Sequence, residues 1–238
     1  MNDLGDIWVY LSSSPLLHLT TTLVAYLIGA RLYRRFNLNP LLNPVLIAVV
    51  ILVSVLLVTD TDYATYFEGA QFVHFLLGPA TVALAIPLYN QIDRVRRSAV
   101  ALLSALVLGS LSAAASAAAI AWGLGAGPEV VASIAPKSVT TPIAMGISEK
   151  LGGLPSLTAV LVILTGVLGA TLGPLLLNLL RIRDWRARGL AIGVAGHGIG
   201  TARAMQVSEI AGAFAGLAMG LNALATAILL PLIWAWVF

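Results

Sequence analysis

Lys137 lies between two prolines in an apolar part of the chain, in the run Ala135-Pro136-Lys137-Ser138-Val139-Thr140-Thr141-Pro142. A charged side chain at the centre of a bilayer costs about 2.5 to 3.5 kcal/mol, so an interaction at the site must offset that cost. The prolines interrupt a helix and leave backbone amides and carbonyls without helical partners. A cation beside free amides and hydroxyls suits a small anion. The run therefore predicts an anion-binding site at a broken helix.

A second polar segment, His197-Gly198-Ile199-Gly200-Thr201-Ala202-Arg203, interrupts another apolar stretch. The planar guanidinium of Arg203 can hold a carboxylate through two hydrogen bonds, and the glycines let backbone approach a ligand. His197 can donate to a substrate or carry a proton, since imidazole titrates near neutral pH. Together the two segments give the expected substrate-binding set: Lys137, Ser138, Thr140, Thr141, Thr81, His197, Gly198, Gly200, Thr201 and Arg203.

The residues of the first segment also have structural explanations. Lys137 can extend toward the membrane surface or pair with Glu149 or Glu209. Thr140 and Thr141 can satisfy the backbone groups that the prolines free. Glu149 and its neighbour Lys150 suit the solvent-exposed end of a hairpin. The alternative for Glu149 is a role in coupling transport to an ion.

The remaining polar residues also have structural explanations beside the functional ones. Arg203 can pair with Glu209 at the membrane edge, and His197 can be a structural histidine. Asn222, deep in the last apolar stretch, can hydrogen-bond across helices or coordinate a coupling cation, and the first of these is favoured. His18 and His74 are expected to be structural.

Enzyme chemistry finds little support in this sequence. The chain has no cysteine and no His-Glu-x-x-His spacing, so thiolate and zinc-hydrolase sites are excluded, and no P-loop is present. Lys137 and Ser138 are adjacent, and adjacent residues on a helix do not face each other, so a Ser-Lys dyad is not expected. We expect no catalytic residue, no metal and no cofactor. The net charge of +3 requires no nucleic-acid partner.

Composition places these segments in a membrane. Of the 238 residues 59% are apolar and 10% are charged, and the mean hydropathy is +0.97. Such values are typical of a polytopic membrane protein. The 22 glycines and the alanine-rich segment 113–121 suit close packing of helices in lipid. The lipid bilayer is therefore an expected partner.

Apolar runs of about 20 residues are long enough to cross a bilayer. They occur at 16–35, 41–59, 70–90, 98–122, 155–180 and 212–236. Two further segments, 130–150 and 189–209, are interrupted and are candidates for re-entrant helices that line a cavity.

Arginine clusters predict the orientation of these spans. They follow the first span, the third span and the run that ends near 180, in segments 31–35, 94–97 and 181–188. All three clusters lie in the cytoplasm if 130–150 enters and leaves on one side. If 189–209 crosses the membrane, the chain has seven spans and Phe238 lies inside. If 189–209 re-enters, the chain has six spans and Phe238 lies outside. We favour seven spans, which gives an all-α polytopic fold with a re-entrant hairpin.

A weak internal repeat aligns Pro79-Ala80-Thr81-Val82 with Pro136-Lys137-Ser138-Val139. Each copy has a proline-broken polar segment before a small-residue helix, as in carriers built from inverted repeats. We expect one membrane domain over 1–238. Its parts are scaffold or oligomerisation helices at 1–60, two related units at 70–122 and 130–180, and a broken helix plus the last span at 189–238.

Three runs resemble the LrgB/CidB family of membrane proteins. They are 136–145 with Gly152-Gly153 and Leu157-Thr158-Ala159, the stretch 77–89, and 197–204. The resemblance extends over about residues 40–235. It implies one of two functions: an antiholin-like or holin-like regulator of murein hydrolase activity, or a carrier of small monocarboxylates related to the plant plastidial glycolate/glycerate translocator.

A glycolate-sized anion needs one or two cations, a few donors and a helix N-terminus, and the chain supplies all three. We therefore expect a secondary carrier of glycolate, glycerate, pyruvate or lactate, with the regulator as the alternative. The resemblance also implies a bacterial inner-membrane location and a small LrgA/CidA-like membrane partner. A homodimer is expected because carriers of this build need a fixed scaffold.

Overall fold

The structure is a computed structural model that describes residues 14–36, 39, 42–76, 79, 82–83 and 89–237. Within these residues the regular elements are helices and no strand occurs, so the predicted all-α fold is confirmed. Four of the described helices are long and apolar enough to cross a membrane: α2 (Pro15–Arg35), α8 (Ala99–Gly123), α11 (Pro155–Leu179) and α13 (Glu209–Val237). Of the expected span at 70–90, residues 77–78, 80–81 and 84–88 lie outside the described residues.

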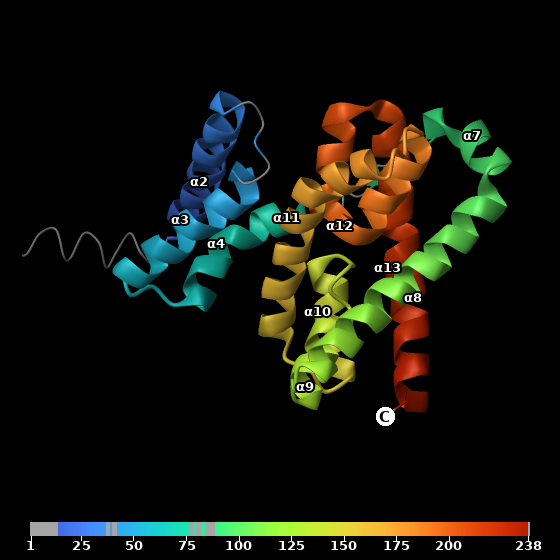
Figure 1. Cartoon of the computed structure of the whole chain (residues 1–238). Helices are drawn as coiled ribbons and strands as arrows, with labels where there is room; N and C mark the ends of the chain where they lie inside the picture. Colours follow the sequence, from blue (N-terminus) through green and yellow to red (C-terminus); the bar gives the residue numbers. More distant parts are fainter. Residues whose placement is uncertain are drawn as a thin grey trace, which may run out of the picture. The chain divides into compact units, whose positions relative to one another are not determined.

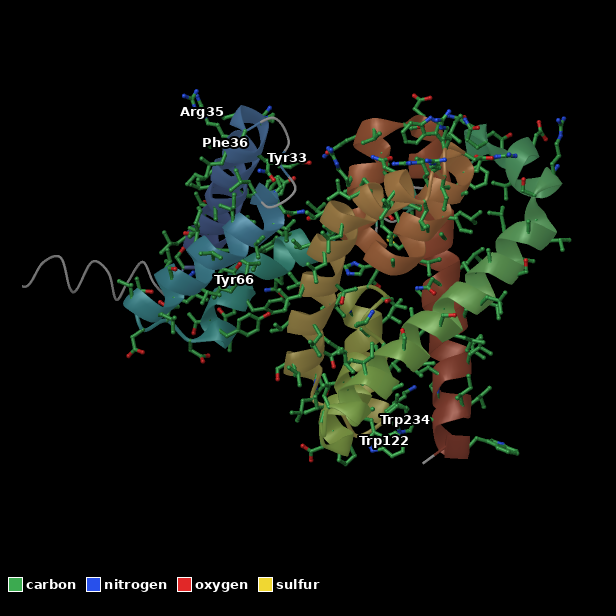
Figure 2. The ribbon with its side chains drawn as sticks, viewed as in Figure 1. Tyr33, Arg35, Phe36, Tyr66, Trp122 and Trp234 are labelled. Carbon is green, nitrogen blue, oxygen red and sulfur yellow. The ribbon has the colours of Figure 1, made fainter. Side chains whose placement is uncertain are left out.

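The chain divides into two compact units, Met1–Ala83 and Leu84–Phe238. In the first unit α2 packs against α3 (Pro44–Val58) and α4 (Tyr63–Phe75). His18 on α2 is buried and lies edge-on to Tyr66 of α4, with ring centroids 5.8 Å apart. The His18 side chain thus takes part in helix packing, as expected. Figure 2 labels Tyr66, its partner on α4.

The second unit holds both interrupted segments (Figure 1). Its helices are α7 (Ile92–Arg97), α8, α9 (Pro128–Ile134), α10 (Thr141–Lys150), α11, α12 (Trp185–Val207) and α13.

Prolines and glycines fix where the helices between 99 and 179 begin and end. Pro128 and Pro155 occupy first-turn positions of α9 and α11, where the missing amide hydrogen costs nothing. Gly125 and Gly152 follow α8 and α10 with φ +84 and φ +82 respectively. This left-handed conformation ends a helix, and glycine adopts it without strain. The sequence therefore determines both turns that flank the α9–α10 segment.

The segment 128–150 forms a helix–bend–helix that we call the first hairpin. Its arms are α9 and α10, and its bend is residues 135–140. The arms return toward each other, because Ser133 near the end of α9 and Ser148 near the end of α10 both contact Thr158 at the start of α11. This is the re-entrant arrangement that the prolines predicted for 130–150.

The segment 185–207 also folds back, and we call it the second hairpin. The helix α12 breaks at His197, which has φ 38 and ψ -132. After the break the chain returns along the first arm, since a Cβ added at Gly200 would lie 2.8 Å from the Ile192 carbonyl oxygen. The favoured crossing of 189–209 is therefore wrong. A helix cannot continue through a left-handed residue, so the chain reverses there.

The two hairpins enter the second unit from opposite ends. A cavity of about 360 Å³ is lined by Arg97, Trp185, Arg186 and Ile210, so α8, α12 and α13 all begin at one end, here called the basic end. At the other end Trp122 of α8, Val131 of α9 and Trp234 of α13 line a common cavity. The second hairpin starts and finishes at the basic end, whereas the first starts and finishes at the opposite end (Figure 1).

Asp184 begins α12 at the basic end. Its carboxylate accepts a hydrogen bond from the Arg186 amide at 2.8 Å and pairs with the Arg186 guanidinium. The Arg186 side-chain hydrogen bond lowers the pKa of Asp184 to about 2. This exposed pair is of the kind that caps a helix and adds little stability by itself.

Gly193 allows the second hairpin to approach α13. A Cβ added at Gly193 would clash with the Ala215 carbonyl oxygen, whereas one added at Gly220 would meet nothing within 4 Å. We expect Gly193→Ala to destabilise the protein by about 1 to 3 kcal/mol, because backbone must move to make room. Gly220→Ala, the matched control, should be neutral or slightly stabilising. Melting temperatures of the purified proteins in detergent measure both; equal values for the two variants would contradict the packing.

Single cysteines can test the re-entry of 185–207, because the chain has no cysteine of its own. We expect cysteines at Arg183 and Val207 to react with an impermeant thiol reagent from the same side of the membrane, and a cysteine at Gly127 from the opposite side. Labelling of intact and of opened vesicles shows which side of the membrane each cysteine faces. Reaction of the Val207 position from the side of Gly127 would show that the segment crosses.

Candidate functional site

Lys137 occupies the bend of the first hairpin. Its side chain is half-buried, and its Nζ donates a hydrogen bond of 3.3 Å to Ser138 Oγ. Among the described residues Lys137 makes no ion pair. Glu149, one of its two expected structural partners, is exposed at the far end of α10. The charge of Lys137 is therefore not neutralised by a carboxylate in the part of the chain that the structure describes.

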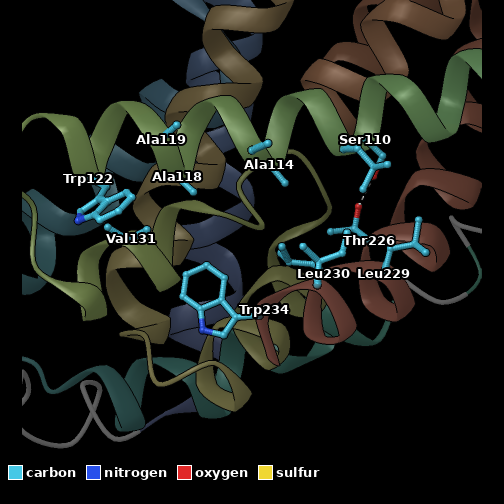
Figure 3. Close-up of a pocket in the computed structure, with 13 residues that line it drawn as sticks. Ser110, Ala114, Ala118, Ala119, Trp122, Val131, Thr226, Leu229, Leu230 and Trp234 are labelled. Carbon is cyan, nitrogen blue, oxygen red and sulfur yellow. Dashed lines mark hydrogen bonds between the residues drawn. The ribbon is translucent and has the colours of Figure 1, made fainter. Parts of the chain in front are cut away.

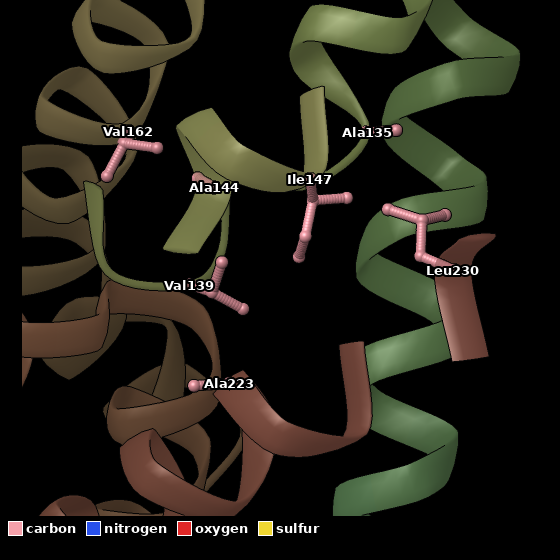
Figure 4. Close-up of a cluster of buried hydrophobic side chains, with 7 residues drawn as sticks. All are labelled: Ala135, Val139, Ala144, Ile147, Val162, Ala223 and Leu230. Carbon is pink, nitrogen blue, oxygen red and sulfur yellow. The ribbon is translucent and has the colours of Figure 1, made fainter. Parts of the chain in front are cut away.

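Apolar packing holds the bend in place. Val139 of the bend is buried with Ala144 and Ile147 of α10, Val162 of α11 and Ala223 of α13 (Figure 4). Ala135 and Leu230 complete this cluster. Three helices thus fix the backbone on either side of Lys137, which is what a preorganised binding site requires.

The start of α10 adds donors beside Lys137. The first hydrogen bond within this helix runs from the Ala144 amide to the Thr140 carbonyl at 2.9 Å. The amides of Thr141 and Ile143 precede this bond and have no partner in the helix. The Thr140 hydroxyl makes no capping bond to these amides. A helix N-terminus with free amides favours negative charge.

A hydroxyl network that the sequence analysis missed joins the first hairpin to α11. Thr158 Oγ1 lies 3.0 Å from the Ser133 carbonyl and 2.7 Å from Ser148 Oγ, and the Leu154 amide donates to Ser133 Oγ at 2.7 Å. These hydroxyls clamp both arms to the next helix. The available signal was the occurrence of small hydroxyl residues in otherwise apolar helices, where they find partners across helices.

His197 forms the turn of the second hairpin. The ring is 4% exposed, and its Nε2 lies 2.8 Å from the Val162 carbonyl of α11. Its φ 38 with ψ -132 is a conformation that glycine favours, so a histidine there is strained. Val162 also packs with Val139 of the first hairpin's bend, so His197 lies against the part of α11 that this bend contacts.

Asn222 of α13 connects the two hairpins. Its Nδ2 donates to the Ser138 carbonyl in the bend of the first hairpin at 2.9 Å, and to the Val194 carbonyl in the second hairpin at 3.3 Å. The favoured interpretation of Asn222 as a bond across helices agrees with these contacts. The hairpins thus meet beside Lys137, and we call Lys137, Ser138, the start of α10, His197 and Asn222 the junction site.

Other residues of the expected set lie away from the junction site or serve packing. Gly200 is packed on Ile192, and the buried Thr201 hydroxyl donates to the Ala215 carbonyl at 3.4 Å. A Cβ at Gly198 would have only Met219 Sδ nearby, at 3.9 Å. The observed contacts of Gly200 and Thr201 are those of helix packing, and their substrate roles stay predictions.

Arg203 lies six residues beyond His197, about 9 Å along the second arm toward the basic end. Its Nη1 donates to Gln206 Oε1 at 3.5 Å. The described contacts do not bring Arg203 to Lys137, so its part in binding stays a prediction. Thr81, the donor expected from the facing repeat, is outside the described residues.

The apolar groove between α8 and α13 is a separate feature. Its volume is about 310 Å³, and Figure 3 shows it bounded by alanines of α8 and by Trp122 and Trp234. A hydrogen bond of 2.9 Å between Ser110 and Thr226 joins the two helices at one end of the groove. None of the side chains that line it is charged, so it lacks the cation that a carboxylate needs.

Gly166 on α11 makes room for the His197 ring. An added Cβ would lie 2.6 Å from His197 Cε1, whereas at Gly173 on the same helix the nearest atom would be Ile192 Cγ1 at 3.7 Å. We expect Gly166→Ala to lower stability by about 1 to 3 kcal/mol and Gly173→Ala to have little effect. Thermal unfolding in detergent is the measurement. Tolerance of Gly166→Ala would mean that the ring does not sit against α11.

Comparison with known proteins finds relatives that match most of the chain. YxaC and YwbG of Bacillus subtilis (strain 168) are each 39% identical, over 91% and 86% of this chain and 94% and 91% of their own lengths. The antiholin-like protein LrgB of Bacillus mycoides (strain KBAB4) is 34% identical over 92% of this chain and 95% of its own length. No solved structure matches the chain.

The sequence model of the LrgB-like family matches residues 22–236, a range that includes both hairpins. The resemblance found in the runs around Lys137 and His197 is therefore confirmed. The chain is a membrane protein that belongs to the LrgB-like family.

Proposed function

We propose that this protein is a secondary carrier that moves small monocarboxylates, such as glycolate, glycerate, pyruvate or lactate, across the bacterial inner membrane. The observation that carries the proposal is Lys137, a cation at a broken helix without an ion pair among the described residues. Ionisable groups at membrane depth mark substrate pathways unless a partner neutralises them. A substrate carboxylate would supply that partner.

The geometry of the junction site fits one carboxylate. Lys137 provides the charge, and the Thr141 and Ile143 amides at the start of α10 provide donors on the same bend. Ser138, Thr140 and Thr141 add hydroxyls within four residues of Lys137. Charge-assisted hydrogen bonds of this type are stronger than neutral ones, so a single small anion can be held by few groups.

The opposed hairpins support alternating access to this site. The first hairpin reaches the junction site from one end of the second unit, and the second hairpin reaches it from the basic end. Movement of one hairpin at a time would open the site to one side only. We place the basic end in the cytoplasm because Lys and Arg are retained there.

The antiholin-like function is the second candidate, and the names of relatives favour it. Several Bacillus proteins of 34% identity are named antiholin-like protein LrgB, and none of the three compared relatives is named as a carrier. In this function the protein would act through oligomers, or through a small LrgA/CidA-like membrane partner. Such a role gives no reason for an unneutralised lysine at the junction of two hairpins.

Uptake by proteoliposomes tests the carrier function. We expect labelled glycolate, lactate or pyruvate to accumulate, and Lys137→Ala to reduce uptake by about 30-fold or more, because truncation of one partner of a buried charge pair costs about 2 to 5 kcal/mol. Lys150→Ala is the matched control, since Lys150 is exposed at the end of α10 and should leave uptake unchanged. Arg203→Ala reports whether the second expected cation takes part.

Two outcomes would contradict this proposal, one its carrier function and the other its binding site. Absence of uptake for every small carboxylate, with correctly inserted protein, would remove it directly. Equal loss in Lys137→Ala and Lys150→Ala would show that the effect is not local to the junction site. If lysis phenotypes of the cell depend on the protein but are unaltered by Lys137→Ala, the antiholin-like function stands instead.

A further inference from the structure

The cavity at the basic end lies at the level of the lipid headgroups. Its lining comes from the end of α7 and the starts of α12 and α13: Arg97, Asp184, Trp185, Arg186 and Ile210. The apolar helices α8 and α13 begin beside it and run from there into the membrane. In Figure 2 nitrogen atoms, drawn in blue, gather at this end of the second unit. A lipid headgroup can therefore reach the cavity directly.

The two arginines of this cavity keep hydrogen-bond donors for a ligand. Arg97 is exposed and makes no ion pair or hydrogen bond among the described residues. Asp184 accepts hydrogen bonds from Nε and Nη2 of Arg186, while Nη1 of Arg186 has no partner in the same part of the structure. A guanidinium carries five N–H donors, so this ion pair does not exhaust Arg186. An oxyanion can thus be held from two sides of the cavity.

The rest of the lining is apolar and held in place. Trp185 is 41% exposed, and the Arg188 guanidinium lies 5.2 Å from the centre of its ring. Arg188 also donates to the Ile182 carbonyl at 2.8 Å, which fixes the cation against the ring. Ile210 adds an aliphatic side chain. Tryptophan favours the boundary between headgroups and hydrocarbon. A soluble anion has no use for this apolar lining, whereas a phospholipid carries glycerol and acyl chains beside its phosphate.

We propose that the cavity at the basic end binds an anionic phospholipid, with its phosphate between Arg97 and Arg186 and its glycerol part against Trp185 and Ile210. Arginine pairs with phosphate through two parallel hydrogen bonds, and basic residues at the ends of membrane helices attract anionic lipids. The bound phosphate would connect the end of α7 to the first arm of the second hairpin. Lipid binding here does not depend on the carrier function.

Titration of delipidated protein in detergent with single phospholipids, followed by native mass spectrometry, tests this site. We expect phosphatidylglycerol to bind about tenfold more tightly than phosphatidylcholine with the same acyl chains, because only the first has a net negative charge. Arg97→Gln and Arg186→Gln should each weaken phosphatidylglycerol binding about fivefold, the contribution of one basic residue near a membrane surface. Arg35→Gln is the matched control: it removes an exposed arginine at the end of α2 and should leave the affinity unchanged.

Asp184→Asn should have the opposite effect. Asparagine caps a helix as well as aspartate does, so α12 keeps its start, but the carboxylate that engages Arg186 is gone. We expect phosphatidylglycerol to bind about two- to fivefold more tightly to this variant, because Arg186 is released and a negative charge is removed from the cavity. The same titration measures it, and weaker binding would overturn the proposal.

The other outcomes are equally decisive. Equal affinity for the two lipids, or equal losses in Arg97→Gln and Arg35→Gln, would show general attraction to a basic protein and would overturn the site. Full competition by glycerophosphoglycerol, the headgroup without acyl chains, would assign the cavity to a soluble phosphate instead. If a variant yields no protein, wild type decides: the preference for phosphatidylglycerol should fall as salt rises, and a preference independent of salt would contradict a site built on exposed arginines.

Discussion

The charge of Lys137 is the constraint on which the rest of this structure depends. A lysine at membrane depth needs an oppositely charged or strongly accepting partner. Its recorded contact, however, is a hydrogen bond of 3.3 Å to a neighbouring serine hydroxyl. The surrounding structure keeps the lysine there: buried Val139 and Ile147 anchor the bend, and the hydroxyls around Thr158 clamp both arms to α11. In the proposed carrier function, a visiting carboxylate would neutralise the lysine without a permanent protein partner.

Two hairpins that enter from opposite ends make such a visit compatible with transport. Each reaches the junction site from one end of the second unit, and Asn222 hydrogen-bonds to a backbone carbonyl of each. The strained turn at His197 is part of the same arrangement, because only a sharp reversal brings the second hairpin to the site without crossing. Strain of this kind persists where packing enforces it, here against Val162 and Gly166.

The first hairpin could be predicted from the sequence, whereas re-entry of the second was only the less favoured of two alternatives. Prolines at 136 and 142 with a lysine between them exclude a continuous span, so the bend followed from local chemistry. The reversal at His197 involves no proline, and the flanking Gly198 and Gly200 were interpreted as points of ligand approach. Gly200 instead packs on Ile192, a contact that exists only after the chain has folded back. The contacts of Asn222 also depended on the tertiary structure, since nothing in the sequence fixes which carbonyls its amide meets.

An experimental density map of the protein saturated with glycolate or L-lactate would show whether Lys137 binds the acid. We expect density for the acid within hydrogen-bond distance of Lys137 Nζ and of the first amides of α10. A Lys137 ammonium held against a protein carboxylate, with no density for the acid at the bend, would contradict it.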